Sequence, residues 1–160
     1  MSGAEKKVFI SYRRSASRHL ARLIALDLRA HGYDVFLDVD TIHNGEFDRI
    51  VLAQIAERMH FVLVLSPGAL ERCPLPDDWL RREIEEALRL KRNIVPILEE
   101  GFSFEDAAES LPESLRDLPR FNGVPLYHFY FEAAMLTLRR RFLKPQAEAV
   151  ADEETDQPAG

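Results

Sequence analysis

The chain has 160 residues, of which 46% are hydrophobic and 30% are charged. This balance is ordinary for a soluble globular domain, and it excludes a fibrous chain, a largely disordered chain and a bundle of membrane-spanning helices. The formal net charge of −6 opposes general attraction to nucleic-acid phosphates, so any bound phosphate must meet a local cluster of basic residues.

Short apolar runs alternate with helical periodicity along the first half of the chain. The expected strands are 8–10, 35–37 and 61–65, and the expected helices are 17–31 and a segment that starts near Phe47. Ser17 is predicted to cap the first helix, and Gly32 follows its end. The second helix is expected to bury Ile50 and Ile55. The run 61–65 is apolar throughout, which is typical of a central strand in a parallel sheet.

The second half of the chain continues the alternation. Its expected elements are a helix at 79–90, a strand at 94–98, a strand near 126–129 and a helix at 131–143. Pro96 removes one backbone donor from its strand, which predicts a bulge or irregular pairing there. The prolines within 99–124 indicate a long connection with only short helical turns. Residues 145–160 are acidic and small, without an aromatic side chain, so we expect a disordered tail after one domain at 5–144.

Strands that alternate with helices predict an α/β fold, doubly wound and flavodoxin-like, with a five-stranded parallel sheet and helices on both faces. Ligands of such sheets bind at the loops that follow the carboxyl ends of the strands. These loops are 12–14, 38–46, 66–78 and 99–104. They are where a functional site is expected.

An acid and an indole lie near the start of the predicted helix 79–90. Leu80 and Ile84 share the face that packs on the sheet, whereas Trp79 and Glu83 stack on a neighbouring face at the margin between core and solvent. An aromatic plane beside a carboxylate suits a ribose and base site. An acid near a helix start beside a partly buried tryptophan is also a common structural arrangement. Spacing alone leaves both interpretations open.

Two arginines, Arg13 and Arg14, follow the first predicted strand. Guanidinium groups at this position suit the oxygens of a pyrophosphate, but solvated arginines that pair with nearby acids would give the same pattern. The chain has no glycine-rich loop of the GxGxxG or Walker type. A dehydrogenase or an NTPase therefore lacks its main sequence support.

Asp38 and Asp40 follow the second strand, where a response regulator would place a Mg²⁺ site. The arginines after the first strand bring cations where such a site needs carboxylates, so Asp38 is expected to pair with an arginine or to order its loop. The five histidines have no metal-binding spacing, and no metal site is expected. The only cysteine, Cys73, rules out an internal disulfide and reads as an ordinary loop thiol. With no apolar run of a signal peptide in residues 1–7, a cytoplasmic location is expected.

Taken in order, these segments resemble the TIR (Toll/interleukin-1 receptor) domain family, especially its NAD-hydrolase members from animals and bacteria. The resembling segments are VFISYRR at 8–14, GYDVFLDVD at 32–40 with Gly45 and Phe47, VLVLSPGAL at 62–70 with Cys73, DWLRREI at 78–84 and NIVPI at 93–97. The resemblance covers about 7–143. A series of motifs in the correct order is far more specific than any one of them.

The resemblance implies an enzyme that cleaves the nicotinamide–ribose bond of NAD⁺, giving nicotinamide and ADP-ribose or a cyclic product, with Glu83 as the catalytic residue. The substrate-binding residues that it implies are Tyr12, Arg13, Arg14, Asp38, Gly45, Phe47 and Trp79. NAD⁺ would be the substrate, so no cofactor is implied. His128 matches a histidine of these hydrolases loosely. Phe104 stands in place of a tryptophan, which would weaken stacking on the ligand of a neighbouring molecule.

Family behaviour also implies activation by self-association of TIR domains, in immune or cell-death signalling. The alternative is a non-catalytic TIR adaptor that acts only through protein–protein interaction. An adaptor need not keep Glu83 together with Trp79, so the presence of both favours the enzyme. A phosphoacceptor response regulator is disfavoured by Arg13 and Arg14.

Overall fold

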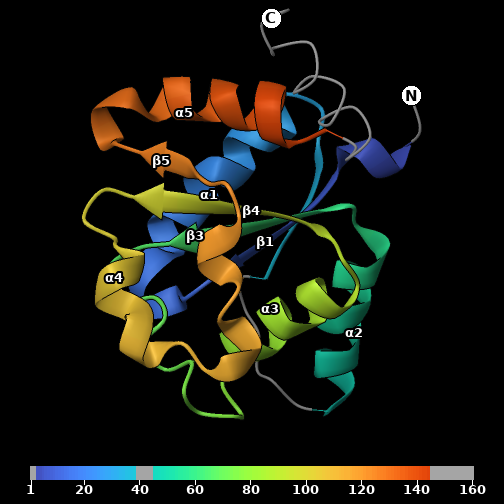
Figure 1. Ribbon diagram of the computed structural model, residues 1–160. Coiled ribbons are helices and arrows are strands. Elements are labelled where there is room, and N and C mark those ends of the chain that lie inside the picture. The colour runs from blue at the N-terminus through green and yellow to red at the C-terminus, as the bar shows by residue number, and fades with distance from the viewer. Residues whose placement is uncertain (1–2, 39–44, 145–160) are drawn as a thin grey trace, which may run out of the picture.

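A parallel β-sheet forms the centre of the computed structural model, which describes residues 3–38 and 45–144. Its strands are β1 (Lys7–Tyr12), β2 (Asp34–Leu37), β3 (His60–Leu65), β4 (Asn93–Glu99) and β5 (Val124–Leu126). They pair in parallel in the order β2-β1-β3-β4-β5. The predicted five-stranded, flavodoxin-like fold is confirmed (Figure 1).

Helices cover both faces of the sheet. They are α1 (Arg14–Ala30), α2 (Gly45–Glu57), α3 (Trp79–Arg89), the short α4 (Phe104–Ala107) and α5 (Phe131–Thr137), which continues as a π-helical turn over Leu138–Phe142. One core lies between the sheet and α1 with α5, and a second core lies between the sheet and α2 with α3 (Figure 1). Short 3₁₀ turns lie at Gly3–Lys6, Ala108–Ser110, Glu113–Leu115, Leu118–Arg120 and His128–Tyr130. The long connection between β4 and β5 therefore holds only short helical turns, as predicted.

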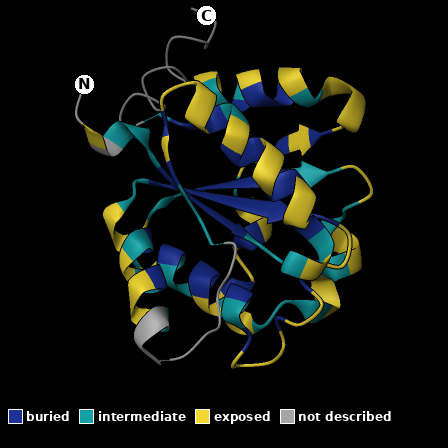
Figure 2. Ribbon diagram, turned by 180° about the vertical axis from the view of Figure 1, so that it is seen from behind, coloured by how far each residue is buried: buried dark blue, intermediate teal, exposed yellow. Residues whose placement is uncertain are grey.

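Burial on both faces explains the apolar sequence of β3. All six of its residues, His60–Leu65, are buried. Figure 2 shows the central strands as mostly buried and the outward surfaces of the helices as largely exposed. A strand with solvent on neither side must place apolar side chains on both sides, so its sequence does not alternate.

Two expectations about the helices were wrong in detail. The first helix begins at Arg14, and Ser17 is not its cap; the buried Ser17 hydroxyl instead donates a hydrogen bond to Ser66 Oγ at 2.8 Å, linking α1 to the end of β3. In α2 the buried face runs through Val51, whereas Ile50 is 49% exposed. Packing against the sheet decided both the role of Ser17 and the buried face of α2, and a rotation of the helix by one residue changes which side chains face the sheet.

The bulge predicted at Pro96 does not form, because β4 pairs with β3 in continuous register through Pro96 opposite Leu63. The ladder with β5 begins only at Ile97 opposite Val124, so Pro96 lies before it. Its carbonyl oxygen faces Gly123, where a Cβ would lie only 2.8 Å away. The missing donor thus falls where no ladder bond is needed, and glycine allows the close approach.

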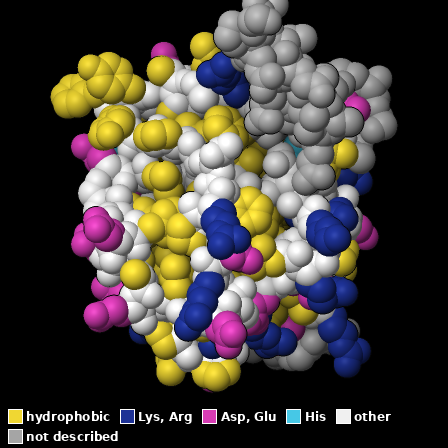
Figure 3. Space-filling model, viewed as in Figure 1, with side chains coloured by type: hydrophobic (Ala, Val, Ile, Leu, Met, Phe, Trp, Pro, Cys, Tyr) yellow, Lys and Arg dark blue, Asp and Glu magenta, His cyan; other side chains and the backbone are white. Residues whose placement is uncertain are grey.

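The last strand was predicted at 126–129, but β5 spans Val124–Leu126. The chain leaves the sheet after Leu126 and enters the turn His128–Tyr130. The predicted tail at 145–160 and Asp40 lie outside the described residues. Among the helices that are described, none is both long enough and apolar enough to span a bilayer. Acidic and basic side chains of the described residues are interspersed over the face shown in Figure 3, so no extended basic surface forms there.

The strand order places the expected ligand site. From β1 the chain moves to one side to form β2, then returns to the other side of β1 to form β3 and β4. The direction of winding therefore reverses at the neighbouring strands β1 and β3. A crevice opens outside the carboxyl ends of the strands at such a point.

Candidate active site

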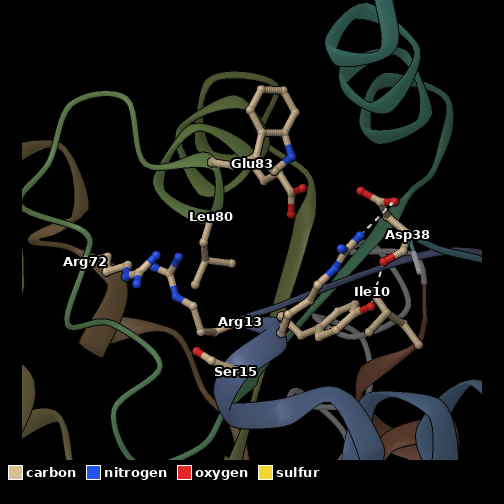
Figure 4. Close-up of a pocket in the computed structure, with 10 residues that line it drawn as sticks. Ile10, Arg13, Ser15, Asp38, Arg72, Leu80 and Glu83 are labelled. Carbon is tan, nitrogen blue, oxygen red and sulfur yellow. Dashed lines mark hydrogen bonds and ion pairs between the residues drawn. The ribbon is translucent and has the colours of Figure 1, made fainter. Parts of the chain in front are cut away.

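A cleft of about 320 Å³ lies at the carboxyl end of β1, between the first turns of α1 and α3. Its volume is within the usual range of small-molecule sites. The predicted site residues that line it are Tyr12, Arg13, Arg14, Asp38, Trp79 and Glu83, joined by Ile10, Ser15, Arg72 and Leu80. Figure 4 shows the carboxyl groups of Glu83 and Asp38 reaching into this space from opposite sides. Gly45 begins α2, and the side chain of Phe47 lies outside the described part of the structure.

Glu83 is buried, not marginal as the helical spacing predicted. It is 5% exposed, and its Oε1 atom accepts a hydrogen bond of 2.6 Å from the hydroxyl of Ser11. Burial raises the pKa of Glu83 to about 8; the Ser11 hydroxyl and the Trp79 indole lower it, while the negative charge of Asp38 raises it. In the ligand-free domain at neutral pH, Glu83 is therefore mostly protonated.

The raised pKa of Glu83 predicts how stability depends on pH. An unfolded chain releases this proton near the ordinary glutamate pKa, whereas the folded domain keeps it until about pH 8. The contribution of protonated Glu83 to the free energy of unfolding is thus fully present below the unfolded pKa and is lost as pH rises towards 8. We expect Glu83→Gln to gain stability relative to wild type between pH 5 and pH 8 in urea titrations. A constant difference across this range would contradict the buried, protonated state.

Ser11 was not singled out from the sequence, although it bonds directly to Glu83. A serine at the end of an apolar strand is a weak signal, because strands commonly end in polar residues. In the structure it is 1% exposed and lies on the face of β1 that is turned towards α3. The contact joins positions 72 residues apart, which no local pattern can reveal.

Arg13 is held in the wall of the cleft by Asp78. Two guanidinium nitrogens bond the two carboxylate oxygens at 2.6 and 2.9 Å, and Arg13 Nε donates to the carbonyl of Ala69 at 2.9 Å. Asp78 also caps α3, because it accepts a 3.0 Å bond from the backbone N–H of Arg81. Burial alone would raise the pKa of Asp78, but these donors outweigh it and hold the pKa below its ordinary value. The charge of Arg13 is therefore already matched, which leaves Arg14 as the better candidate for phosphate binding.

Arg14 and Tyr12 organise the opposite wall through Asp38. Arg14 lies 3.9 Å from the Asp38 carboxylate, which confirms that Asp38 pairs with an arginine. The Tyr12 hydroxyl donates to the Asp38 backbone carbonyl at 2.6 Å, and burial raises the tyrosine pKa. The side chain of Arg14 is still 41% exposed. Its pairing is loose enough for a ligand phosphate to compete for it.

Cys73 is a buried thiol outside the lining of this cleft, with no exposed surface. Burial raises its pKa to about 12, with a further increase from Asp78. A thiol in this state is a poor nucleophile. We expect iodoacetamide to leave Cys73 unmodified in the native domain and to modify it fully in guanidinium chloride, as measured by intact mass. Rapid native labelling would contradict this assignment.

A second cavity, of about 410 Å³, shares Arg14 and Ser15 with the first. His128 lines it, with its Nε2 atom 3.0 Å from a carboxylate oxygen of Glu99. Phe104 lines neither of these two cavities and packs edge-on against Phe102, with ring centroids 5.1 Å apart. Among the described residues, no group of three or more His, Cys, Asp or Glu side chains is arranged to hold a metal ion.

Comparison with known proteins identifies the family. The TIR domain profile matches residues 8–127. The chain is 40% identical over 136 residues to the NAD(+) hydrolase tir-1 of Caenorhabditis elegans, and 42% identical over 136 residues to the NAD(+) hydrolase sarm1 of Drosophila melanogaster. These alignments cover 83% of this chain but only 14% and 10% of the two relatives, so the chain corresponds to a small part of each.

A solved structure supports the same fold. The TIR domains of the activated Roq1 resistosome superpose with a TM-score of 0.55 at 16% identity, over 94% of this chain and 98% of that one. The length of the profile match, the identity to the two hydrolases and the strand order agree. The chain therefore belongs to the TIR domain family.

Proposed function

We propose that this domain cleaves NAD⁺ between nicotinamide and ribose, with Glu83 as the catalytic residue. The observation that carries the proposal is the Glu83 carboxyl group, buried beside an indole at a cleft of small-molecule size. The identity of about 40% to NAD(+) hydrolases supports the choice of substrate. The products would be nicotinamide and ADP-ribose or a cyclic ADP-ribose.

One carboxyl group is sufficient for this bond. Ordinary glycosidases need a second one, because a sugar alkoxide must be protonated as it leaves. Nicotinamide in NAD⁺ is a cationic leaving group, and it departs neutral when the C1′–N bond pair moves to its ring nitrogen. The remaining requirement is to stabilise positive charge on the ribose, which an ionised Glu83 supplies. Water then adds to C1′ and releases a proton to solvent, which gives ADP-ribose. In the cyclic product, a nitrogen of the substrate's own adenine ring bonds to C1′ in place of water.

The substrate itself helps to ionise Glu83. A positive charge beside a carboxyl group favours the carboxylate and lowers its pKa. In the free domain burial keeps the pKa of Glu83 near 8, so the acid is mostly neutral until a cation arrives. A pyridinium ring bound against Trp79 would bring that cation to the carboxyl group. The same site would bind neutral nicotinamide less well after the reaction.

The rest of the dinucleotide has a path out of the first cavity. Arg14 lines both cavities and its side chain is 41% exposed, which supports its assignment to the pyrophosphate. The second cavity then receives the adenosine end, against the apolar side chains of Leu20 and Leu23. Tyr12 and Asp38 complete the wall near the ribose.

Self-association as the activating event, in immune or cell-death signalling within the cytoplasm, is part of this proposal. It is supported by the family and by the occurrence of similar TIR domains in the Roq1 assembly. A rate that rises more than linearly with protein concentration is the expected sign. A proportional rise over a wide dilution series would count against activation by assembly.

The test is an incubation of purified protein with NAD⁺, followed by chromatography and mass spectrometry of the products. Release of nicotinamide together with ADP-ribose or its cyclic form is expected, over a series of protein concentrations. Absence of products at every concentration would favour the alternative, a TIR adaptor without activity. The product mass and retention time also separate the linear product from the cyclic one.

A further inference from the structure

The hydroxyl of Ser11 and the carboxyl of Glu83 form a buried pair in the centre of the molecule. Ser11 is 1% exposed and Glu83 is 5% exposed, and the donor and acceptor atoms are 2.6 Å apart. Ser11 lies in β1, opposite Leu63 of β3, so the central sheet fixes its backbone. The direction from which the hydroxyl meets Glu83 is therefore set by the paired backbone of the central sheet.

This hydrogen bond engages one oxygen of the carboxyl group. Oε1 accepts the hydrogen bond from Ser11, and the Trp79 indole also acts on this carboxyl group by hydrogen bonding, so two side chains bear on its orientation. A long glutamate side chain has several staggered rotamers, and a fixed donor selects among them. Residues of the same helix also confine the carboxyl group, because Leu80 and Ile84 of α3 are buried against the sheet.

We propose that Ser11 is a positioning residue, which holds the carboxyl group of Glu83 in the orientation that meets the substrate. The inference rests on the proposed NAD⁺ cleavage by Glu83. Ser11 does not touch the reacting atoms; it acts through the carboxyl group. A hydroxyl that donates to a carboxylate also stabilises the ionised form, whereas the nearby charge of Asp38 opposes ionisation. Ser11 and Asp38 thus act on Glu83 in opposite directions.

The pH dependence of kcat separates this role from simple packing. The reaction requires ionised Glu83, so kcat rises with pH as Glu83 loses its proton. Ser11→Ala is expected to move the midpoint of this rise to a higher pH by about one unit, the size expected for loss of one hydrogen bond to a charged group. At a pH below this midpoint, kcat falls by about tenfold, with a smaller change in KM. Ser11→Cys, which keeps a weak donor, gives an intermediate shift. Asp38→Asn moves the midpoint to lower pH.

Ser17→Ala is the matched control. Ser17 is also a buried serine, 2% exposed, but its hydroxyl donates to Ser66 and not to Glu83. This variant removes the same group from another buried position, on α1, while leaving the Ser11–Glu83 pair intact, so its pH profile is expected to match wild type. An equal shift in Ser11→Ala and Ser17→Ala would assign the effect to general loss of packing and overturn the proposal.

A measurement without substrate tests the pair independently of activity. The Glu83 carboxyl carbon is followed by ¹³C NMR in protein labelled at glutamate, and its signal is assigned by its absence in Glu83→Gln. The Glu83 resonance is expected to titrate at higher pH in Ser11→Ala than in wild type. Identical titration in the two proteins refutes the proposal even if NAD⁺ is cleaved. A shifted titration without any NAD⁺ cleavage would instead refute the proposed function and retain the contact.

Discussion

Glu83→Gln is expected to reduce the rate of nicotinamide release by about a hundredfold to a thousandfold, the range seen when one electrostatic contact to a transition state is removed. Glutamine has the same shape, and its amide oxygen still accepts the hydrogen bond from Ser11. It cannot carry the negative charge that stabilises a cationic ribose. The initial rate of nicotinamide release, measured by chromatography at saturating NAD⁺, reports the loss.

The control is another acid of the same helix. Glu85 lies two positions on, where it pairs with Arg81 at 3.2 Å, and it does not line either of the two cavities around Arg14. Glu85→Gln is therefore expected to keep close to wild-type activity. Circular dichroism and thermal unfolding show whether both variants are folded. Full activity of a folded Glu83→Gln variant would rule out the assignment of Glu83 as the catalytic residue.

Asp78→Ala is expected to destabilise the domain by about 3–5 kcal/mol, because it leaves the Arg13 guanidinium buried without its partner. The side chains are 13% and 5% exposed, and the same change removes the N-cap of α3. A loss of this size lowers the melting temperature by roughly 10 °C for a domain of this length. Calorimetry or urea titration near neutral pH measures the effect.

The direction of the pH effect provides a second check on this ion pair. Because the folded pKa of Asp78 is depressed, its contribution is present above the unfolded carboxyl pKa and is lost as pH falls through the folded value. The difference between wild type and Asp78→Ala should therefore shrink in acid. Asp77→Ala, at the exposed neighbouring position, is expected to stay within about 0.5 kcal/mol of wild type. Similar losses in the two variants would show that the Arg13 pair is not the cause.

Much of the fold could be predicted because its signals are local. The continuous apolar run of β3 and the helical spacing of α3 each fit within a short window, and both elements lie where they were predicted. Pro96 shows the limit of such reasoning. Its missing donor was expected to distort the strand, but the effect depends on where the neighbouring strand begins to pair, and the β5 ladder starts one residue later, at Ile97 opposite Val124.

The candidate site divides in the same way. Helical periodicity by itself placed Trp79 beside Glu83, and the sequence put Arg13 and Arg14 after a strand, because these relations span only a few residues. Only the tertiary structure decided that Glu83 is buried against Ser11 and that Arg13 is already engaged by Asp78. The physical reason is that burial, hydrogen bonding and pKa depend on atoms brought together from positions 65 and 72 residues apart, and no periodicity along the chain records those distances.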